Sequence, residues 1–318
     1  MSRFSPSILL LTATLAFGAL APVSAETIVY STDEGAGSVS IINAEKGEVI
    51  GSIAVGDKPR GAAITPDGRT MYVSDQPNNT LVIIDLEQGK RVGSIRLSSS
   101  PEGVAISKDG KWIVVANEEA NTVSFIDTAD NAELFQVATQ GENPERAQFS
   151  PDGKWLYVTA ENGAEVDVID TAQRKSIKLV MVGVHPRDIA FSADGKRVFV
   201  ACQDSEFMAV LDATTHESLA RVPFRKGGVG LAVNPDGRTI YISNRTDNTV
   251  TAIDAVSLKA LAEIPVGKRP WNMAISRDGK LLFVANGKSN SVTVIDTATN
   301  TVAREIPVGA TPWGVFLR

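Results

Sequence analysis

The sequence has very few of the residues on which disulfide frameworks and zinc centres depend. Among 318 residues there is one cysteine, Cys202, and there are two histidines, His185 and His216. One cysteine cannot form an intrachain disulfide, so the fold must be held together by its own core. Two histidines cannot supply a three-histidine zinc site, and the sequence contains no H-E-x-x-H or G-x-S-x-G stretch. These absences leave no catalytic signature in the chain, and we assign no catalytic residue, metal or cofactor.

Long apolar runs are also missing, except near the N-terminus. The run from Ile8 to Leu20 follows Arg3 and is followed by Val23-Ser24-Ala25. A membrane-spanning helix needs about 20 apolar residues, which this run does not reach. A short apolar segment with a basic residue before it and small residues after it is typical of a secretory signal. We therefore predict a cleaved signal peptide over 1–25 and a single exported domain over 26–318, located in the periplasm or secreted.

The chain has no excess of positive charge. It contains 31 lysines and arginines against 37 aspartates and glutamates, which gives a net charge of −6 at pH 7. Proteins that coat nucleic acid with a uniformly basic surface have the opposite balance. The charge balance therefore argues against nucleic-acid binding as the main function. Nucleic-acid binding through one basic side of the molecule is retained as a second alternative.

What the sequence does have is a repeat. The stretches "TPDGRTMYV" (65–73), "SPDGKWLYV" (150–158), "SADGKRVFV" (192–200) and "NPDGRTIYI" (234–242) share one turn-then-strand pattern. The aspartates of this pattern recur every 42 or 43 residues, at 67, 109, 152, 194, 236 and 278. Each unit contains four alternating or apolar stretches separated by turn formers, and none shows helical periodicity over three turns. Four strands in about 42 residues are typical of a propeller blade.

Counting strands gives the number of blades. First strands begin near Pro59, Pro101, Pro144, Pro186, Gly228, Pro270 and Pro312, which makes seven. The N-terminal stretch provides only three strands of its blade, and "PWGVFLR" (312–318) provides the fourth. The prediction is an all-β, seven-bladed β-propeller of four-stranded antiparallel blades. Its ring is closed by the C-terminal strand pairing with the N-terminal blade, which leaves no exposed sheet edge at the junction.

The repeats resemble those of a known family. "LYVTAENGAEVDVIDT" (156–171) and "LFVANGKSNSVTVIDTATNTVAREIPVGATPWGV" (282–315) are similar to the YVTN-type β-propeller repeats of exported bacterial and archaeal proteins. The resemblance covers 26–318 and implies a seven-bladed fold with a binding or scaffolding role, because the family shares no single reaction. Related propellers include lactone hydrolases, surface-layer modules and proteins associated with quinoprotein alcohol oxidation.

Several regularly repeated residues have structural explanations. The aspartates that end the third strands and those of the "PDG" turns precede short turns, where a carboxylate accepts backbone hydrogen bonds. Their spacing of one per blade also separates them too far to share an ion. The aromatic residues at or near one position of the second strands are expected to form a core ladder between blades. These residues are Tyr72, Trp112, Tyr157, Phe199, Tyr241 and Phe283. The small residues of the first strands place those strands innermost.

Function is expected where the repeat varies while the fold persists. The residue after the proline that opens each first strand varies from blade to blade and should lie at the upper mouth of the channel. Neighbouring loops add acidic residues on blades three and four and basic residues on blades six, seven and two. We predict a ligand- or partner-binding site formed by Lys58, Arg60, Glu102, Glu145, Arg187, Arg225, Lys226, Arg245, Arg269, Trp271 and Trp313.

Arginine and tryptophan together suit an anionic or planar small molecule, or an acidic loop of a periplasmic protein. The main hypothesis is therefore a monomeric, non-catalytic binding or scaffold protein, accessory to a periplasmic oxidation or transport system. The alternative is a hydrolase resembling propeller lactonases, in which His185, Asp188, Glu145 and Glu161 hold Ca²⁺ or Mg²⁺ or provide a base. Cys202 has no basic motif beside it and is expected to be a buried thiol.

Overall fold

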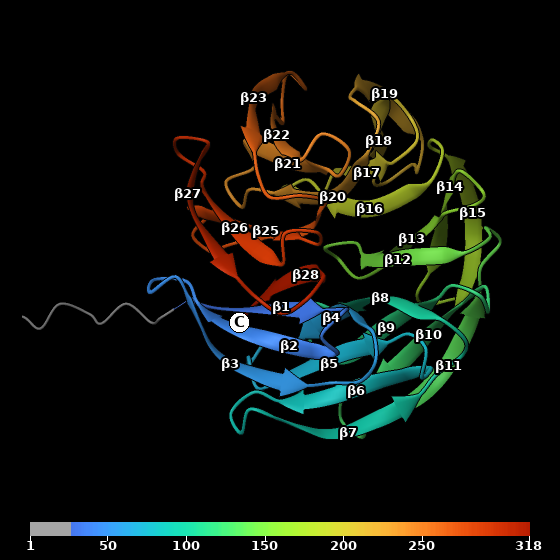
Figure 1. Cartoon of the computed structure of the whole chain (residues 1–318). Coiled ribbons are helices and arrows are strands. Elements are labelled where there is room, and N and C mark those ends of the chain that lie inside the picture. Colours follow the sequence, from blue (N-terminus) through green and yellow to red (C-terminus); the bar gives the residue numbers. More distant parts are fainter. Residues whose placement is uncertain (1–26) are drawn as a thin grey trace, which may run out of the picture.

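The computed structural model describes residues 27–318, which form a ring of seven four-stranded antiparallel sheets (Figure 1). The signal peptide predicted for 1–25 lies outside the described residues. No helix occurs over 27–318, as the missing 3.6-residue periodicity predicted. The described chain accordingly has no helix that is long and apolar enough to cross a membrane.

We number the blades along the chain. Blade one contains β1 (Ile28–Asp33), β2 (Ser38–Asn43), β3 (Glu48–Ala54) and β28 (Pro312–Leu317). Blade two contains β4 (Pro59–Ile64), β5 (Thr70–Asp75), β6 (Thr80–Asp85) and β7 (Lys90–Arg96). Blade three contains β8 (Pro101–Ile106), β9 (Trp112–Asn117), β10 (Thr122–Asp127) and β11 (Ala132–Ala138). Blade four contains β12 (Pro144–Phe149), β13 (Trp155–Ala160), β14 (Glu165–Asp170) and β15 (Lys175–Met181).

The remaining blades repeat this order. Blade five contains β16 (Pro186–Phe191), β17 (Arg197–Cys202), β18 (Phe207–Asp212) and β19 (Ser218–Pro223). Blade six contains β20 (Gly228–Val233), β21 (Thr239–Asn244), β22 (Thr249–Asp254) and β23 (Ala260–Pro265). Blade seven contains β24 (Pro270–Ile275), β25 (Leu281–Asn286), β26 (Ser291–Asp296) and β27 (Thr301–Pro307).

The first strand of each blade is the innermost one, as predicted. Consecutive first strands contact one another around the whole ring, and β28 contacts both β24 and β4. The ring is closed by β28, which pairs antiparallel with β1 and places Phe316 opposite Tyr30. Strands from the two ends of the described chain therefore share one sheet (Figure 1).

The "PDG" turns have the predicted structural role. Asp67 accepts hydrogen bonds from the Thr65 hydroxyl at 2.6 Å and from the Arg69 backbone N–H at 3.0 Å. Gly68 has a φ of 72°, a left-handed conformation that glycine adopts without steric cost. The aspartates after the third strands act similarly, because Asp85 accepts the backbone N–H groups of Glu87 and Gln88, both at 2.9 Å.

The interblade core contains the predicted aromatic ladder with one correction. The third residue of the second strand is Tyr30, Tyr72, Tyr157, Phe199, Tyr241 or Phe283 in six blades, and each is fully or almost fully buried. Tyr30 adds to the set predicted from the sequence. Trp112 does not belong to this ladder, because it is the first residue of β9. Val114 takes the ladder position in blade three, and Trp112 packs edge-on against Phe125 with ring centroids 5.9 Å apart.

Candidate functional site

The channel has a cavity of about 170 Å³ at its upper face, where the first strands begin. Residues from six of the seven blades line this cavity. They are Glu34, Arg60, Glu145, Arg187, Arg245, Arg269, Trp271, Gly287, Thr311, Pro312 and Trp313. We call this space the mouth cavity.

Two sets of equivalent positions supply most of these side chains. The first set is the second residue of each innermost strand: Arg60, Glu102, Glu145, Arg187, Val229, Trp271 and Trp313. The second set is the residue that follows each second strand: Glu34, Gln76, Glu118, Glu161, Gln203, Arg245 and Gly287. The propeller brings both sets to the same end of the channel, because a first strand begins where the antiparallel second strand ends.

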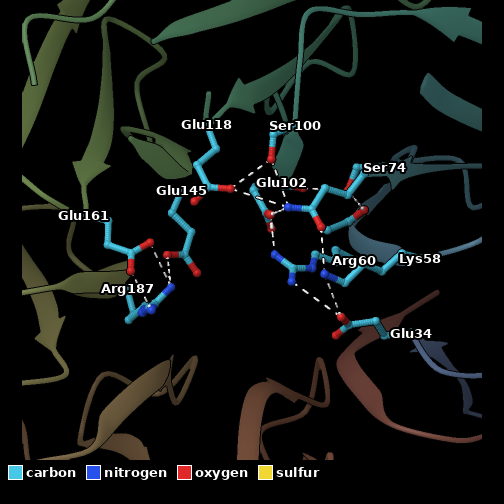
Figure 2. A network of polar contacts seen from close by, with 12 residues as sticks. Glu34, Lys58, Arg60, Ser74, Ser100, Glu102, Glu118, Glu145, Glu161 and Arg187 are labelled. Atoms are coloured by element: carbon cyan, nitrogen blue, oxygen red, sulfur yellow. Dashed lines mark hydrogen bonds and ion pairs between the residues drawn. The ribbon is translucent and has the colours of Figure 1, made fainter. Parts of the chain in front are cut away.

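On one side of the mouth, Arg60 is held by two carboxylates. Its guanidinium forms an ion pair with Glu102 of the next blade and contacts Glu34 Oε1 at 3.5 Å (Figure 2). Lys58 Nζ lies 3.2 Å from the same Glu34 oxygen. Gln76 donates to Glu102 Oε1 at 2.5 Å, so this carboxylate oxygen serves both an amide and a guanidinium.

On the other side, Arg187 has a matching environment. Its guanidinium forms an ion pair with Glu145 and contacts Glu161 Oε1 at 2.7 Å (Figure 2). The Arg187 Nε donates to Gln203 Oε1 at 3.1 Å. Arg60 and Arg187 are therefore each paired with carboxylates of neighbouring blades.

The two glutamates in these pairs are deeply buried. Glu102 is 1% exposed and Glu145 is 6% exposed. Burial raises the pKa of Glu102 to about 7, although the charge of Arg60 opposes the shift. Burial likewise raises the pKa of Glu145 well above its usual range, against the charge of Arg187. The Arg60–Glu102 pair is consequently sensitive to protonation near neutral pH.

The cations around Trp271 are arranged differently. The guanidinium carbons of Arg245 and Arg269 lie 4.8 Å and 5.0 Å from the centroid of the Trp271 ring, and that of Arg187 lies 6.0 Å away. These distances are within the range of cation–π attraction. Arg245 also donates to Gln203 Oε1 at 2.9 Å. Within residues 27–318, neither Arg245 nor Arg269 forms an ion pair with a carboxylate, and the Arg269 Nε is buried without a hydrogen-bond partner.

A buried ion pair lies deeper in the channel. Arg146 Nε is 3.0 Å from Asp188 Oδ1, and Asp188 Oδ2 accepts the backbone N–H of Leu231 at 2.8 Å. The Arg146 guanidinium lies 5.9 Å from the centroid of the Trp313 ring. Arg146 and Asp188 also line a wider opening of about 560 Å³ formed by the inner strands. A further small cavity of about 10 Å³ has Arg146 and Trp313 in its lining, together with Glu145, Arg187 and Trp271 of the mouth cavity.

The structure brings together seven of the eleven predicted site residues. Arg60, Glu145, Arg187, Arg245, Arg269, Trp271 and Trp313 line the mouth cavity. Glu102 is buried against Arg60, and Lys58 contacts Glu34 at the edge. Arg225 and Lys226 lie elsewhere, because they line a separate groove with Phe224 and Glu263. Arg225 is paired there with Asp247 and Glu263, each at 3.1 Å.

The residues considered for a bound cation or a general base are engaged with other partners. His185 pairs with Asp204, Asp188 with Arg146, and both Glu145 and Glu161 with Arg187. Over 27–318, no group of three His, Cys, Asp or Glu side chains is arranged to hold a metal ion. Cys202 is buried, as predicted, and burial raises the pKa of its thiol to about 12. His216 is buried as well, with its Nδ1 2.6 Å from the Tyr157 hydroxyl.

Sequence reasoning missed several residues of the site. Three of them are Glu34 and Gln203, which contact arginines of the mouth, and Gln76, which binds Lys58 and Glu102. A fourth is Arg146, which lies beneath the mouth and pairs with Asp188. The signal for the first three was present, because they follow the second strands with the same spacing as Glu118 and Arg245.

The family model for YNCE-like beta-propellers matches residues 2–318, nearly the whole chain. The chain belongs to the YNCE-like beta-propeller family. This agrees with the YVTN-type resemblance read from the repeats. No curated protein matches the sequence.

Solved structures share the fold at low identity. Hydrazine synthase of Kuenenia stuttgartiensis is similar with a TM-score of 0.77 and 24% identity, over 88% of this chain and 99% of that chain. A protein of unknown function from Desulfotomaculum acetoxidans has a TM-score of 0.80 and 17% identity, over 91% and 98% of the two chains. The dihydro-heme d1 dehydrogenase NirN has a TM-score of 0.70 and 16% identity, over 96% and 77%. Because these proteins differ in function, the likeness concerns the propeller fold alone.

Proposed function

We propose that this YNCE-like propeller is an exported, non-catalytic binding protein that holds a small anionic molecule in the mouth cavity. One observation carries the proposal: Arg245 and Arg269 face Trp271 in a cavity, and neither has a carboxylate partner among the described residues. A partly desolvated guanidinium without a directly paired carboxylate is costly, and an anion would supply charge-assisted hydrogen bonds. Export to the periplasm is part of the proposal and follows from the signal predicted for 1–25.

The dimensions of the cavity support a small ligand. An apolar cavity of about 150 Å³ binds benzene, and the mouth cavity has about 170 Å³. A ligand of comparable size fits, whereas a folded protein loop could insert only a side chain or two. The proposed ligand is therefore a metabolite rather than a macromolecule.

Calorimetric titration of the purified protein with citrate, succinate, benzoate and glycerol 3-phosphate tests this function. At least one of these anions should bind the wild type, and Arg245→Gln or Arg269→Gln should weaken that binding about tenfold or more. Arg225→Gln is the matched control, because Arg225 lies in the separate groove and is 61% exposed. Absence of binding by every anion, or equal loss in the control, would refute the proposal.

A single-stranded oligonucleotide should be included in the same titration. The earlier alternative of nucleic-acid binding relies on phosphate contacts, which weaken steeply with salt. Tight oligonucleotide binding at about 150 mM salt that depends on Arg225 and Lys226 would favour that alternative over the small anion. We expect no such binding, because Arg225 is already paired with Asp247 and Glu263.

A further inference from the structure

The charge balance of the mouth cavity gives information about the ligand itself. Arg60 forms ion pairs with Glu102 and Glu34, and Arg187 forms ion pairs with Glu145 and Glu161. Arg245 and Arg269 have no such ion pairs within residues 27–318. The lining of the mouth cavity thus contains four arginines and two glutamates, and these two glutamates are paired with Arg60 and Arg187.

The two uncompensated arginines reach the same ring from different loops. Arg245 follows β21 of blade six, whereas Arg269 precedes β24 of blade seven. Both guanidiniums lie within 5.0 Å of the Trp271 centroid. They are consequently close enough for one small molecule to contact both, and each retains N–H groups that no residue of the described chain accepts.

The two charges also disfavour each other. The pKa of Arg245 is lowered, first by burial and then by the charges of Arg269 and Arg187. A ligand with one negative charge would compensate only one of the two guanidiniums. A ligand with two negative charges would compensate both, so the second charge should contribute binding free energy of its own.

We infer that the ligand of the mouth cavity is a small dianion, bound through Arg245 and Arg269 beside the ring of Trp271. The inference rests on the anion-binding function proposed above and adds the charge of the ligand. Two sources have this chemistry. A short dicarboxylate carries one charge at each end, and a phosphate monoester carries close to two charges on one group.

The test compares molecules that differ in charge and little else. Succinate and its monoamide, succinamate, have nearly the same size but differ by one negative charge. In calorimetric titrations at low salt and pH 7.5, the wild type should bind succinate about tenfold more tightly than succinamate. Glycerol 3-phosphate is titrated in parallel, and tighter binding than that of succinate would assign the dianion to the phosphate monoesters.

Single variants then locate the second charge. In Arg245→Gln and in Arg269→Gln, the preference for succinate over succinamate should fall from about tenfold to about twofold or less, with succinamate binding largely retained. Arg225→Gln should keep the wild-type preference. Unchanged melting temperatures of the three variants would show that each remains folded.

The possible outcomes separate this inference from the proposed function. If anions bind but the wild type does not distinguish succinate from succinamate, the inference is wrong and the anion-binding function stands. An equal loss of both affinities in each variant would also overturn the inference, because the second charge would then have no binding group of its own. If no anion binds, the proposed function and the inference both fail.

Discussion

Arg60 of β4 forms an ion pair with Glu102 of β8, the residue at the same position of the next blade. The propeller repeat makes such pairs possible, because equivalent positions of adjacent innermost strands are neighbours at the channel. Arg187 and Glu145 have the same relationship, in the opposite order along the chain. Both pairs combine an arginine at the cavity wall with a carboxylate whose burial raises its pKa.

The first prediction concerns Glu102 and stability. Its pKa rises from 4.5 in the unfolded chain to about 7 in the folded protein. Between these two values the unfolded chain releases a proton that the folded protein retains, so the free energy of unfolding falls as pH rises. The contribution, on the order of 3 kcal/mol, is fully present below pH 4.5 and lost above pH 7.

The variant Glu102→Gln should lack this contribution. Chemical denaturation at several pH values should show that the variant gains stability relative to the wild type as pH rises from 4.5 to 7. The control is Glu87→Gln, whose side chain is 57% exposed and pairs with Arg69 on the surface. Parallel pH profiles for Glu102→Gln and the wild type would contradict the prediction.

The second prediction concerns Glu145 and ligand affinity. Glu145 lines the mouth cavity and is bound to Arg187. Glu145 also interacts electrostatically with Glu102, Glu161, Arg60 and Arg245. An anion in the cavity would repel the ionised Glu145 carboxylate and raise its pKa further, so binding should be coupled to proton uptake.

Affinity for succinate should therefore decrease as pH rises from 6.5 to 8.5, a range in which both succinate carboxyls are largely ionised. In Glu145→Gln the affinity should be several-fold higher at pH 8.5 and should vary less with pH than in the wild type, although Glu102 still titrates near pH 7. Titrations in two buffers with different ionisation enthalpies would count the protons taken up. An equal count in the wild type and the variant would refute the role of Glu145.

The third prediction uses Trp271 as a reporter. Its ring contacts both arginines that are proposed to bind the ligand. Ligand binding should change its fluorescence, and Trp271→Leu should abolish most of this change and weaken succinate binding about tenfold, because the arginines lose the surface that orients them. Trp155→Leu is the control, since Trp155 packs against His216 with ring centroids 4.9 Å apart. Trp313 also lines the mouth cavity, so only a fluorescence change that persists in both Trp271→Leu and Trp313→Leu would place the ligand elsewhere.

Most of the fold could be predicted because its determinants are local. Alternating apolar residues define the strands, and the turn residues between them define where each strand ends. The period of 42 or 43 residues then fixed the number of blades, and the first strands begin at the predicted residues, from Pro59 to Pro312. Trp112 was assigned to the aromatic ladder wrongly because residue type alone does not distinguish the first position of β9 from the third.

The site could be predicted only in part. Positional equivalence placed Arg60 and Trp271 at the mouth, because each follows the proline that opens an innermost strand. It could not show that Arg60 would pair with Glu102, since pairing depends on side-chain conformation across blades. The prediction that Arg225 lies at the mouth was wrong. The preceding residue, Phe224, packs into the core between blades five and six, and Arg225 consequently lies in the separate groove.

The fourth prediction concerns closure of the ring. β28 pairs with β1 and buries Trp313 and Val315, and Val315 packs in one core cluster with Val29 and Phe283. Deleting residues 312–318 would remove this strand and expose the inner edge of β1. Burial of each large apolar side chain contributes about 1.5–3 kcal/mol, and the lost backbone hydrogen bonds add to this cost. Since 1 kcal/mol shifts the melting temperature of a large domain by about 2–4 °C, the truncated protein should melt at least about 10 °C lower or aggregate.

Deleting Arg318 alone is the control and should change the melting temperature by no more than a few degrees, because this residue follows the end of β28. Circular dichroism of both proteins provides the measurement, and addition of a synthetic 312–318 peptide should partly restore the truncated protein. Melting of the truncated protein within about two degrees of the intact chain would show that pairing of β28 with β1 does not hold the ring together.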